Sequence, residues 1–164
     1  MEITLTQNMK VVSAIPSTIG GGVAVMGTGI SLKYVHRLFI IVNYEDGGAG
    51  DAVALYRDTD VGGGTADAGL IVNNVKLWTN ADIATSDTLV RQADNTFHLF
   101  DDSNLDQMAV FDVDPVTLGL TANNVEYDCI AVGFPALSVF STASATYVAF
   151  TRYPQATPPS IIEN

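Results

Sequence analysis

The sequence is short of several residue types on which common classes of protein depend. Its 164 residues include a single cysteine, Cys129, so no disulfide can form within the chain. Lysine and arginine together number only 7 against 18 acidic residues, and they are scattered singly. Nucleic-acid-binding proteins normally carry a basic stripe that displaces counterions from phosphates, and this sequence has none. The composition therefore argues against nucleic acid as a partner.

Long apolar runs are missing as well. The longest strongly apolar run, residues 38–42, is far shorter than the ~20 residues that a membrane-spanning helix needs. The first ten residues lack the basic region followed by an apolar stretch that marks a signal peptide. We therefore expect synthesis and folding in a cytoplasm and no membrane partner.

The composition that is present is that of a folded domain. Apolar residues make up 48% of the chain, which argues against disorder, and the length predicts one domain with a core of its own. Charged residues make up 15%, well below the roughly 25% of an average globular protein. An uncharged surface of this kind suits burial against other proteins.

The apolar segments are short, and turn residues separate them. No stretch keeps a helical period over three turns. Glycine-rich breaks at 45–51 and 59–69 interrupt the pattern, and a turn of helix is expected at 114–120 or 101–107. The spacing predicts an antiparallel β-sandwich or jelly-roll-like barrel. About nine strands are expected, at 23–27, 34–44, 52–58, 70–78, 87–92, 96–101, 108–114, 126–134 and 145–152. The segments at 87–92 and 96–101 are expected to pair as a hairpin.

Motifs for phosphate binding, metal binding and catalysis are incomplete. The glycine-rich stretches have neither the Lys-Ser/Thr pair nor the following helix that a phosphate loop needs. His36 and His98 stand singly, whereas zinc needs three or four convergent ligands. Asp112 and Asp114 share one face of a strand, where we expect them to lie beside water. The sequence thus predicts no enzyme, no cofactor and no resident metal.

Two individual features leave a choice of interpretation. Asp102, Asn104 and Asp106 match the first, third and fifth positions of an EF-hand loop, but Gln107 replaces its glycine and Val113 its bidentate acid. A solvated acidic loop is the interpretation we favour, and a weak calcium site within residues 101–114 remains the alternative. Cys129 lies in an apolar strand segment, which predicts a small core side chain rather than a nucleophile.

The C-terminal stretch FTRYPQATPPSIIEN can neither pair in a sheet nor form a helix, because it is rich in proline. We divide the chain into a β-sandwich domain, residues 1–150, and an extended arm, residues 151–164. In polyproline geometry such an arm reaches on the order of 40 Å. We predict that it docks on another subunit, and a frayed terminus is the alternative. The predicted contact residues are Arg152, Tyr153, Pro154, Pro158, Pro159, Ile161 and Ile162, with the two isoleucines as apolar anchors.

Four segments of the second half carry a resemblance to a known group. They are VKLWTNADIATSDTLVRQADNTFHL, MAVFDVDP, YDCIAVGF and RYPQATPPSIIEN, and the likeness covers roughly residues 70–164. They resemble small virion structural proteins of tailed bacteriophages, of the type described as decoration, cement or minor head proteins. The resemblance implies a homo-oligomer, a dimer or trimer, that binds the major capsid protein on the outer head surface. It implies no catalytic residues.

Two other functions remain open at this stage. The motifs do not separate a protein of the capsid surface from a head–tail joining or tail protein. A carbohydrate- or cell-surface-binding β-sandwich is a further alternative, because four aromatic residues could form a binding face. These are Tyr34, Tyr44, Tyr56 and Trp78.

Overall fold

The structure is a computed structural model that describes residues 8–61, 69–70, 75–103, 105–120, 126–152 and 161–162. The described residues form twelve strands and one short 3₁₀ helix, η1 (Pro115–Leu118). None of the described helical segments is long and apolar enough to cross a membrane.

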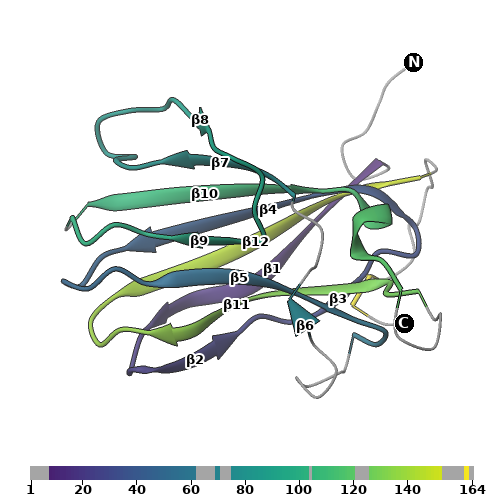
Figure 1. Cartoon of the computed structure of the whole chain (residues 1–164), viewed down its shortest axis with the longest axis horizontal. Helices are drawn as coiled ribbons and strands as arrows, with labels where there is room; N and C mark the ends of the chain where they lie inside the picture. The colour runs from purple at the N-terminus through teal and green to yellow at the C-terminus, as the bar shows by residue number, and fades with distance from the viewer. Residues whose placement is uncertain are drawn as a thin grey trace.

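The strands build two antiparallel sheets that face each other as layers of a sandwich (Figure 1). Sheet 1 has the order β1 (Met9–Ile19), β12 (Thr142–Thr151), β4 (Val35–Glu45), β10 (Asp106–Val113), β7 (Lys76–Asn80) and β8 (Val90–Arg91). Sheet 2 contains β2 (Val23–Met26), β11 (Cys129–Leu137), β5 (Ala52–Asp58) and β6 (Gly69–Leu70), with β3 (Ile30–Ser31) beside β11 and β9 (Phe97–Leu99) beside β5.

The connections follow a jelly-roll topology. Four strands of sheet 1 have the order β1-β12-β4-β10, and four of sheet 2 have the order β2-β11-β5-β9. The chain passes from one sheet to the other at each step along these eight strands except from β5 to β9, which are paired neighbours in sheet 2. Two sheets joined in this way enclose one core, as the sequence predicted.

The core lies between the sheets and is filled by alternate residues of each strand. Along β12, every second side chain from Ala143 to Thr151 is buried, and the residues between are partly exposed. Leu38, Ile40 and Val42 of β4 are fully buried beside them. Tyr147 links the layers, because its hydroxyl accepts a hydrogen bond of 3.0 Å from the backbone N–H of Val132 in sheet 2. The period of two in the sequence thus produces the core face directly.

The long strands run between two ends of the molecule (Figure 1). We call them the arm end, where the predicted arm begins, and the tip end, at the opposite ends of the strands. At the arm end, β12 finishes and β1, β4 and β7 begin. At the tip end, β12 and β10 begin and β4 and β11 finish. The turn between β11 and β12 therefore lies at the tip end, opposite to the site from which residues 151–164 continue.

Two sequence expectations about strands are wrong. The segments at 87–92 and 96–101 do not form a hairpin: β8 pairs with β7 in sheet 1, whereas β9 pairs with β5 in sheet 2. β1, whose eleven residues contain Pro16, was not predicted as a strand. β1 lies at the edge of sheet 1, where a proline is tolerated because one side of the strand has no ladder to complete.

Candidate interaction site

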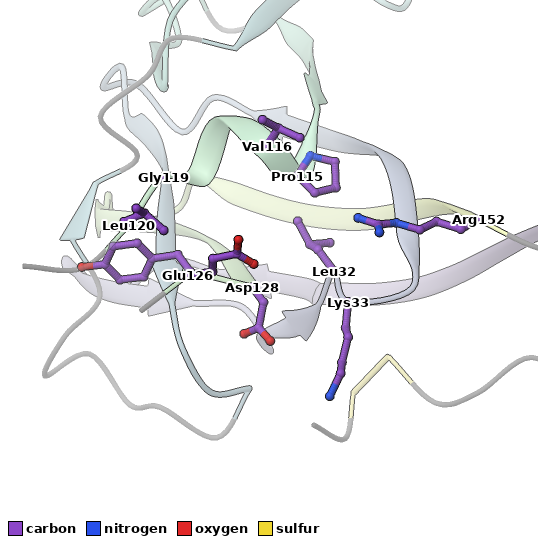
Figure 2. Close-up of a pocket in the computed structure, with 10 residues that line it drawn as sticks. Leu32, Lys33, Pro115, Val116, Gly119, Leu120, Glu126, Asp128 and Arg152 are labelled. Carbon is purple, nitrogen blue, oxygen red and sulfur yellow. The ribbon is translucent and has the colours of Figure 1, made fainter. Parts of the chain in front are cut away.

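The arm end contains a hollow of about 600 Å³ (Figure 2). Leu32 and Lys33 contribute from the β3–β4 connection, Val116 from η1 and Asp128 from the residue before β11. Arg152, the first residue after β12, closes another side. Segments that are far apart in the sequence therefore meet where the predicted arm begins.

Hydrogen bonds at both ends of η1 fix the shape of this side of the hollow. The Asp114 side chain accepts a hydrogen bond of 3.1 Å from the Val116 N–H, and Pro115 supplies the backbone angle that starts the turn. At the other end of η1, Arg57 donates to the Leu118 carbonyl at 2.6 Å. The Arg57 guanidinium also lies 4.3 Å above the ring of Tyr127, a favourable cation–π contact.

Large apolar side chains stand exposed around this hollow. Val116 is 83% exposed and Leu120 is 53% exposed, and both line it. Tyr34, next to Lys33 in the chain, is 47% exposed, and Ile162 is 48% exposed. Single exposed apolar residues are ordinary, but four of this size at one end indicate a contact surface. We call Tyr34, Val116, Leu120 and Ile162 the arm-end rim.

The structure describes three of the seven predicted arm residues. Arg152 is tied to the domain, since its backbone N–H donates to the Tyr34 carbonyl at 2.8 Å and its Nε to the Val35 carbonyl at 3.2 Å. Ile162 is exposed, as an anchor for a neighbour requires. The other four predicted contacts, Tyr153, Pro154, Pro158 and Pro159, lie outside the described residues.

Ile161 lies in the core of its own domain. Its side chain is 2% exposed and belongs to the core cluster, and its carbonyl accepts a 2.6 Å hydrogen bond from the Ser31 N–H in β3. In this structure the side chain predicted to anchor a neighbour thus completes the domain that carries it. The sequence offered no signal for this, because an isoleucine in a proline-rich tail fits either role.

Residues with reactive or ligand-forming side chains lie in separate places. Cys129 is fully buried on β11, as predicted, and burial raises the pKa of its thiol far above its usual value. His36 contacts the Thr151 carbonyl at the arm end, at 3.2 Å. His98, on β9, packs edge-on against Phe100, with ring centroids 4.7 Å apart. Within the part of the chain that the structure describes, no three His, Cys, Asp or Glu residues group as a metal site.

One carboxylate lies elsewhere than expected. Asp112 is only 6% exposed, although the sequence placed it beside water with Asp114. Both of its oxygens accept hydrogen bonds from Arg37, which lies on the neighbouring strand β4 two residues before Phe39, the residue opposite Asp112, and the Arg37 Nε contact measures 2.6 Å. Asp114 instead caps η1. The two acids therefore have separate structural roles and do not form an acid–base pair.

The aromatic face expected for carbohydrate binding is not formed. Tyr44 is 1% exposed and stacks on Phe100 in the core, with ring centroids 4.6 Å apart. Tyr56 lies on sheet 2 and Trp78 on sheet 1. Tyr34 lies at the arm end. The four residues are therefore divided among different parts of the molecule.

No protein-family model matches the chain, and no curated protein matches it. Three solved structures give partial likenesses. The SPBc2 prophage-derived protein YomS is 11% identical, with 88% of this chain and 94% of that chain covered and a TM-score of 0.44. The coat protein of Tobacco streak virus is 10% identical, with 96% of each chain covered and a TM-score of 0.30. The VP2 subviral particle of infectious bursal disease virus is 10% identical, with 92% and 45% covered and a TM-score of 0.23. At these identities and TM-scores the likenesses do not decide what this chain does.

Proposed function

We propose that this chain is a virion structural protein of a tailed bacteriophage that decorates the outer surface of the capsid as a homo-oligomer. It acts by covering and joining protein surfaces, and the major capsid protein is its partner. Jelly rolls occur in viral capsid and lectin domains alike, so the fold itself does not choose between functions. The observation that carries the proposal is the arm end, where exposed apolar side chains surround the root of the arm.

The predicted arm, residues 151–164, contributes a strap to this surface. Prolines reduce the entropy that a segment loses when it becomes fixed on a partner. Arg152 fixes the root of the arm to the domain, and Ile162 presents an exposed apolar side chain beyond Ile161. The resemblance of residues 152–164 to the tails of phage virion proteins supports the same assignment. Several weak contacts of one oligomer on neighbouring capsid subunits add up through their effective concentration.

The outer face of sheet 1 supports self-association. Val11, Val148 and Phe39 stand opposite one another on β1, β12 and β4, and Phe150 meets the Phe39 ring edge-on at 5.8 Å. Within the described residues Val11 is 61% exposed, and Val148 and Phe39 are partly exposed. The charges on this face include two ion pairs, Arg37–Asp112 and Arg91–Asp94. Around the row of Val11, Val148 and Phe39 a second copy therefore meets little repulsion, although each chain has a net charge of −11 and the acids Glu45 and Asp106 lie farther along this face, at the tip end.

The proposal is tested on DNA-free heads assembled from the major capsid protein of the same virus. Deleting residues 151–164 is a poor test, because it also removes Ile161 from the core. The sharper variant combines Val116→Ser with Ile162→Ser, which shortens two exposed side chains. Val90→Ser is the matched control, since Val90 is 57% exposed on edge strand β8 and belongs to no proposed contact.

We expect wild type and Val90→Ser to sediment with heads and the double variant to bind at least ~10-fold more weakly, a loss of ~1.4 kcal/mol. Equal binding by all three proteins would show that the arm end does not contact the capsid. Failure of wild type to bind contradicts the proposed function. Copy number separates decoration from a head–tail joint, because a joint protein is present in about a dozen copies or fewer, in line with ring symmetry.

A further inference from the structure

The tip end carries a second group of strongly exposed apolar side chains. Phe140 is 77% exposed and Val139 is 51% exposed, in the turn between β11 and β12. Ile19, 71% exposed, pairs with Thr142 on one side of this turn, and Val23, 63% exposed, pairs with Leu137 on the other. The register therefore gathers the four side chains around one turn. We call them the tip patch.

The backbone of the tip patch is strained at its largest side chain. Phe140 has a φ of 76°, and it is the only non-glycine residue with a positive φ in the described chain. A bulky residue in this region is uncommon and costs free energy that other contacts must offset. A core position would explain that cost through packing, but Phe140 points to solvent over most of its surface. The strained backbone and the exposed ring of Phe140 together indicate that this side chain contacts another molecule.

A buried polar network holds the tip turn in this shape. Asp51 is 5% exposed and accepts hydrogen bonds from the N–H of Ser138 at 3.0 Å and from its hydroxyl at 2.6 Å. The Tyr44 hydroxyl lies 3.1 Å from Asp51 and 3.2 Å from the hydroxyl of Ser141, so both sides of the turn are tied to one core residue. A Cβ on Gly47 would meet the Phe140 backbone at 2.4 Å. The turn is therefore preorganised, which lowers the entropy lost on binding.

The charged residues of the tip end, to which the tip patch belongs, have one sign. Strand ends and connections of the tip end carry eight acids and none of the seven lysines and arginines. The acids are Glu45, Asp46, Asp51, Asp82, Asp87, Asp101, Asp102 and Asp106. The basic residues lie elsewhere: Arg91 stands beside Trp78 in the middle of β7, and the other six lie toward the arm end. Tip-to-tip contact between two copies is therefore repulsive.

We propose that the tip patch is a second docking site, which fits a basic protein surface that presents an apolar pocket. Phe140 is the anchor, because rigid aromatic side chains in preformed positions carry much of the energy of protein interfaces. The acids of the tip end speed encounter with a basic partner and repel acidic ones. This inference rests on the proposed function, which makes that partner the capsid. The chain then contacts other subunits at both ends of its long axis.

The test uses Phe140→Asn, because asparagine adopts a positive φ more readily than phenylalanine. Binding of DNA-free heads from the same virus is measured together with the melting temperature. We expect a melting temperature equal to or above that of wild type, and head binding at least ~10-fold weaker. Val139→Ser is expected to weaken binding in the same direction. Val90→Ser, which removes a similarly exposed valine from strand β8, is expected to bind as wild type does.

The outcomes separate the two proposals. If wild type binds heads and Phe140→Asn binds equally well, the tip patch is not a docking site, although the proposed function stands. If wild type does not bind heads, the proposed function fails and the inference falls with it. A further check is salt: raising NaCl from about 50 mM to about 500 mM is expected to weaken wild-type binding. Unchanged binding contradicts the assignment of a basic partner.

Discussion

At the scale of single residues, the ion pair between Arg37 and Asp112 is the charged contact with the largest consequence for stability. The Asp112 side chain is 3% exposed, and the Arg37 side chain that binds both of its oxygens is 45% exposed. Removing the arginine leaves a buried carboxylate without its partner. We expect Arg37→Met to lower the free energy of unfolding by ~1–3 kcal/mol, measured by urea denaturation.

Arg91→Met is the matched control for that change. Arg91 also pairs with an aspartate, and it lies 4.8 Å from the centre of the Trp78 ring as Arg37 lies 5.5 Å from that of Phe39. Both members of the Arg91–Asp94 pair are exposed, with side chains at 39% and 48%. The free energy of unfolding should therefore change by less than ~1 kcal/mol. Equal losses in the two variants would show that burial of Asp112 is not what makes its pair important.

His98 gives the stability of the domain a pH dependence. Burial beside Phe100 lowers the pKa of His98 below its usual 6.5, although the charge of Asp101 acts in the opposite direction. Between the folded-state pKa and 6.5 the unfolded chain binds the proton more readily, so protonation favours unfolding. The contribution of His98 is therefore fully present above about pH 6.5 and is lost as the pH falls through the folded-state pKa.

The substitution His98→Leu isolates this contribution. Both proteins keep the same Asp and Glu residues, which are also protonated in acid. The difference between their urea midpoints therefore reports on position 98. We expect the urea midpoint of wild type to fall more than that of His98→Leu between about pH 7.5 and about pH 5.5. Parallel curves for the two proteins would mean that His98 has the same pKa in the folded and unfolded states.

Residue roles were predictable where local pattern decided them. The burial of Cys129 follows from its apolar strand segment, and the side chain is fully buried on β11. Burial of Asp112 was not predictable, because it depends on Arg37, which is 75 residues away in the sequence. Ile161 was predicted to contact a neighbouring subunit, because nothing in the sequence of the tail indicates that the Ser31 N–H of β3 binds its carbonyl.

At the scale of secondary-structure elements, the existence of most strands followed from the sequence, but their partners did not. β5 runs over residues 52–58, as predicted, because glycine-rich breaks bound it on both sides. β8 and β9 were expected to pair because only a short turn lies between them. Their true partners, β7 and β5, place them in different sheets. The sequence of such a short strand does not determine its partner, because the partner depends on contacts with residues that are distant in the sequence.

At the scale of the whole molecule, the fold creates an asymmetry that the sequence hides. The seven basic residues are separated along the chain, and the antiparallel strands bring six of them toward one end. The same topology leaves the tip end with acids, exposed apolar side chains and none of the lysines and arginines. The sequence did not indicate the tip patch, and of the arm-end rim it predicted Ile162 alone, because each surface combines residues from connections that only the jelly roll brings together. The outer face of sheet 1 lies between these two ends.

That outer face leads to a prediction about the oligomer. Val11 is 61% exposed at the edge of the apolar row with Val148 and Phe39, so a carboxylate there is solvated in the monomer and buried in a dimer or trimer. We expect the wild-type protein to form a dimer or trimer in solution and Val11→Asp to shift it toward monomer by light scattering after gel filtration. Desolvating one unpaired charge at each contact opposes association strongly.

Val90→Asp is the control, because it adds the same charge to an edge strand at a site of similar exposure, 57%, outside this row. It should leave the mass of the oligomer unchanged, which separates a local effect from the added charge. A Val11→Asp oligomer as stable as wild type, or a wild-type protein that stays monomeric at high concentration, would remove the outer face of sheet 1 as the surface of self-association. Decoration through the two ends would then have to proceed by single chains, each of which lacks the effective concentration that an oligomer supplies.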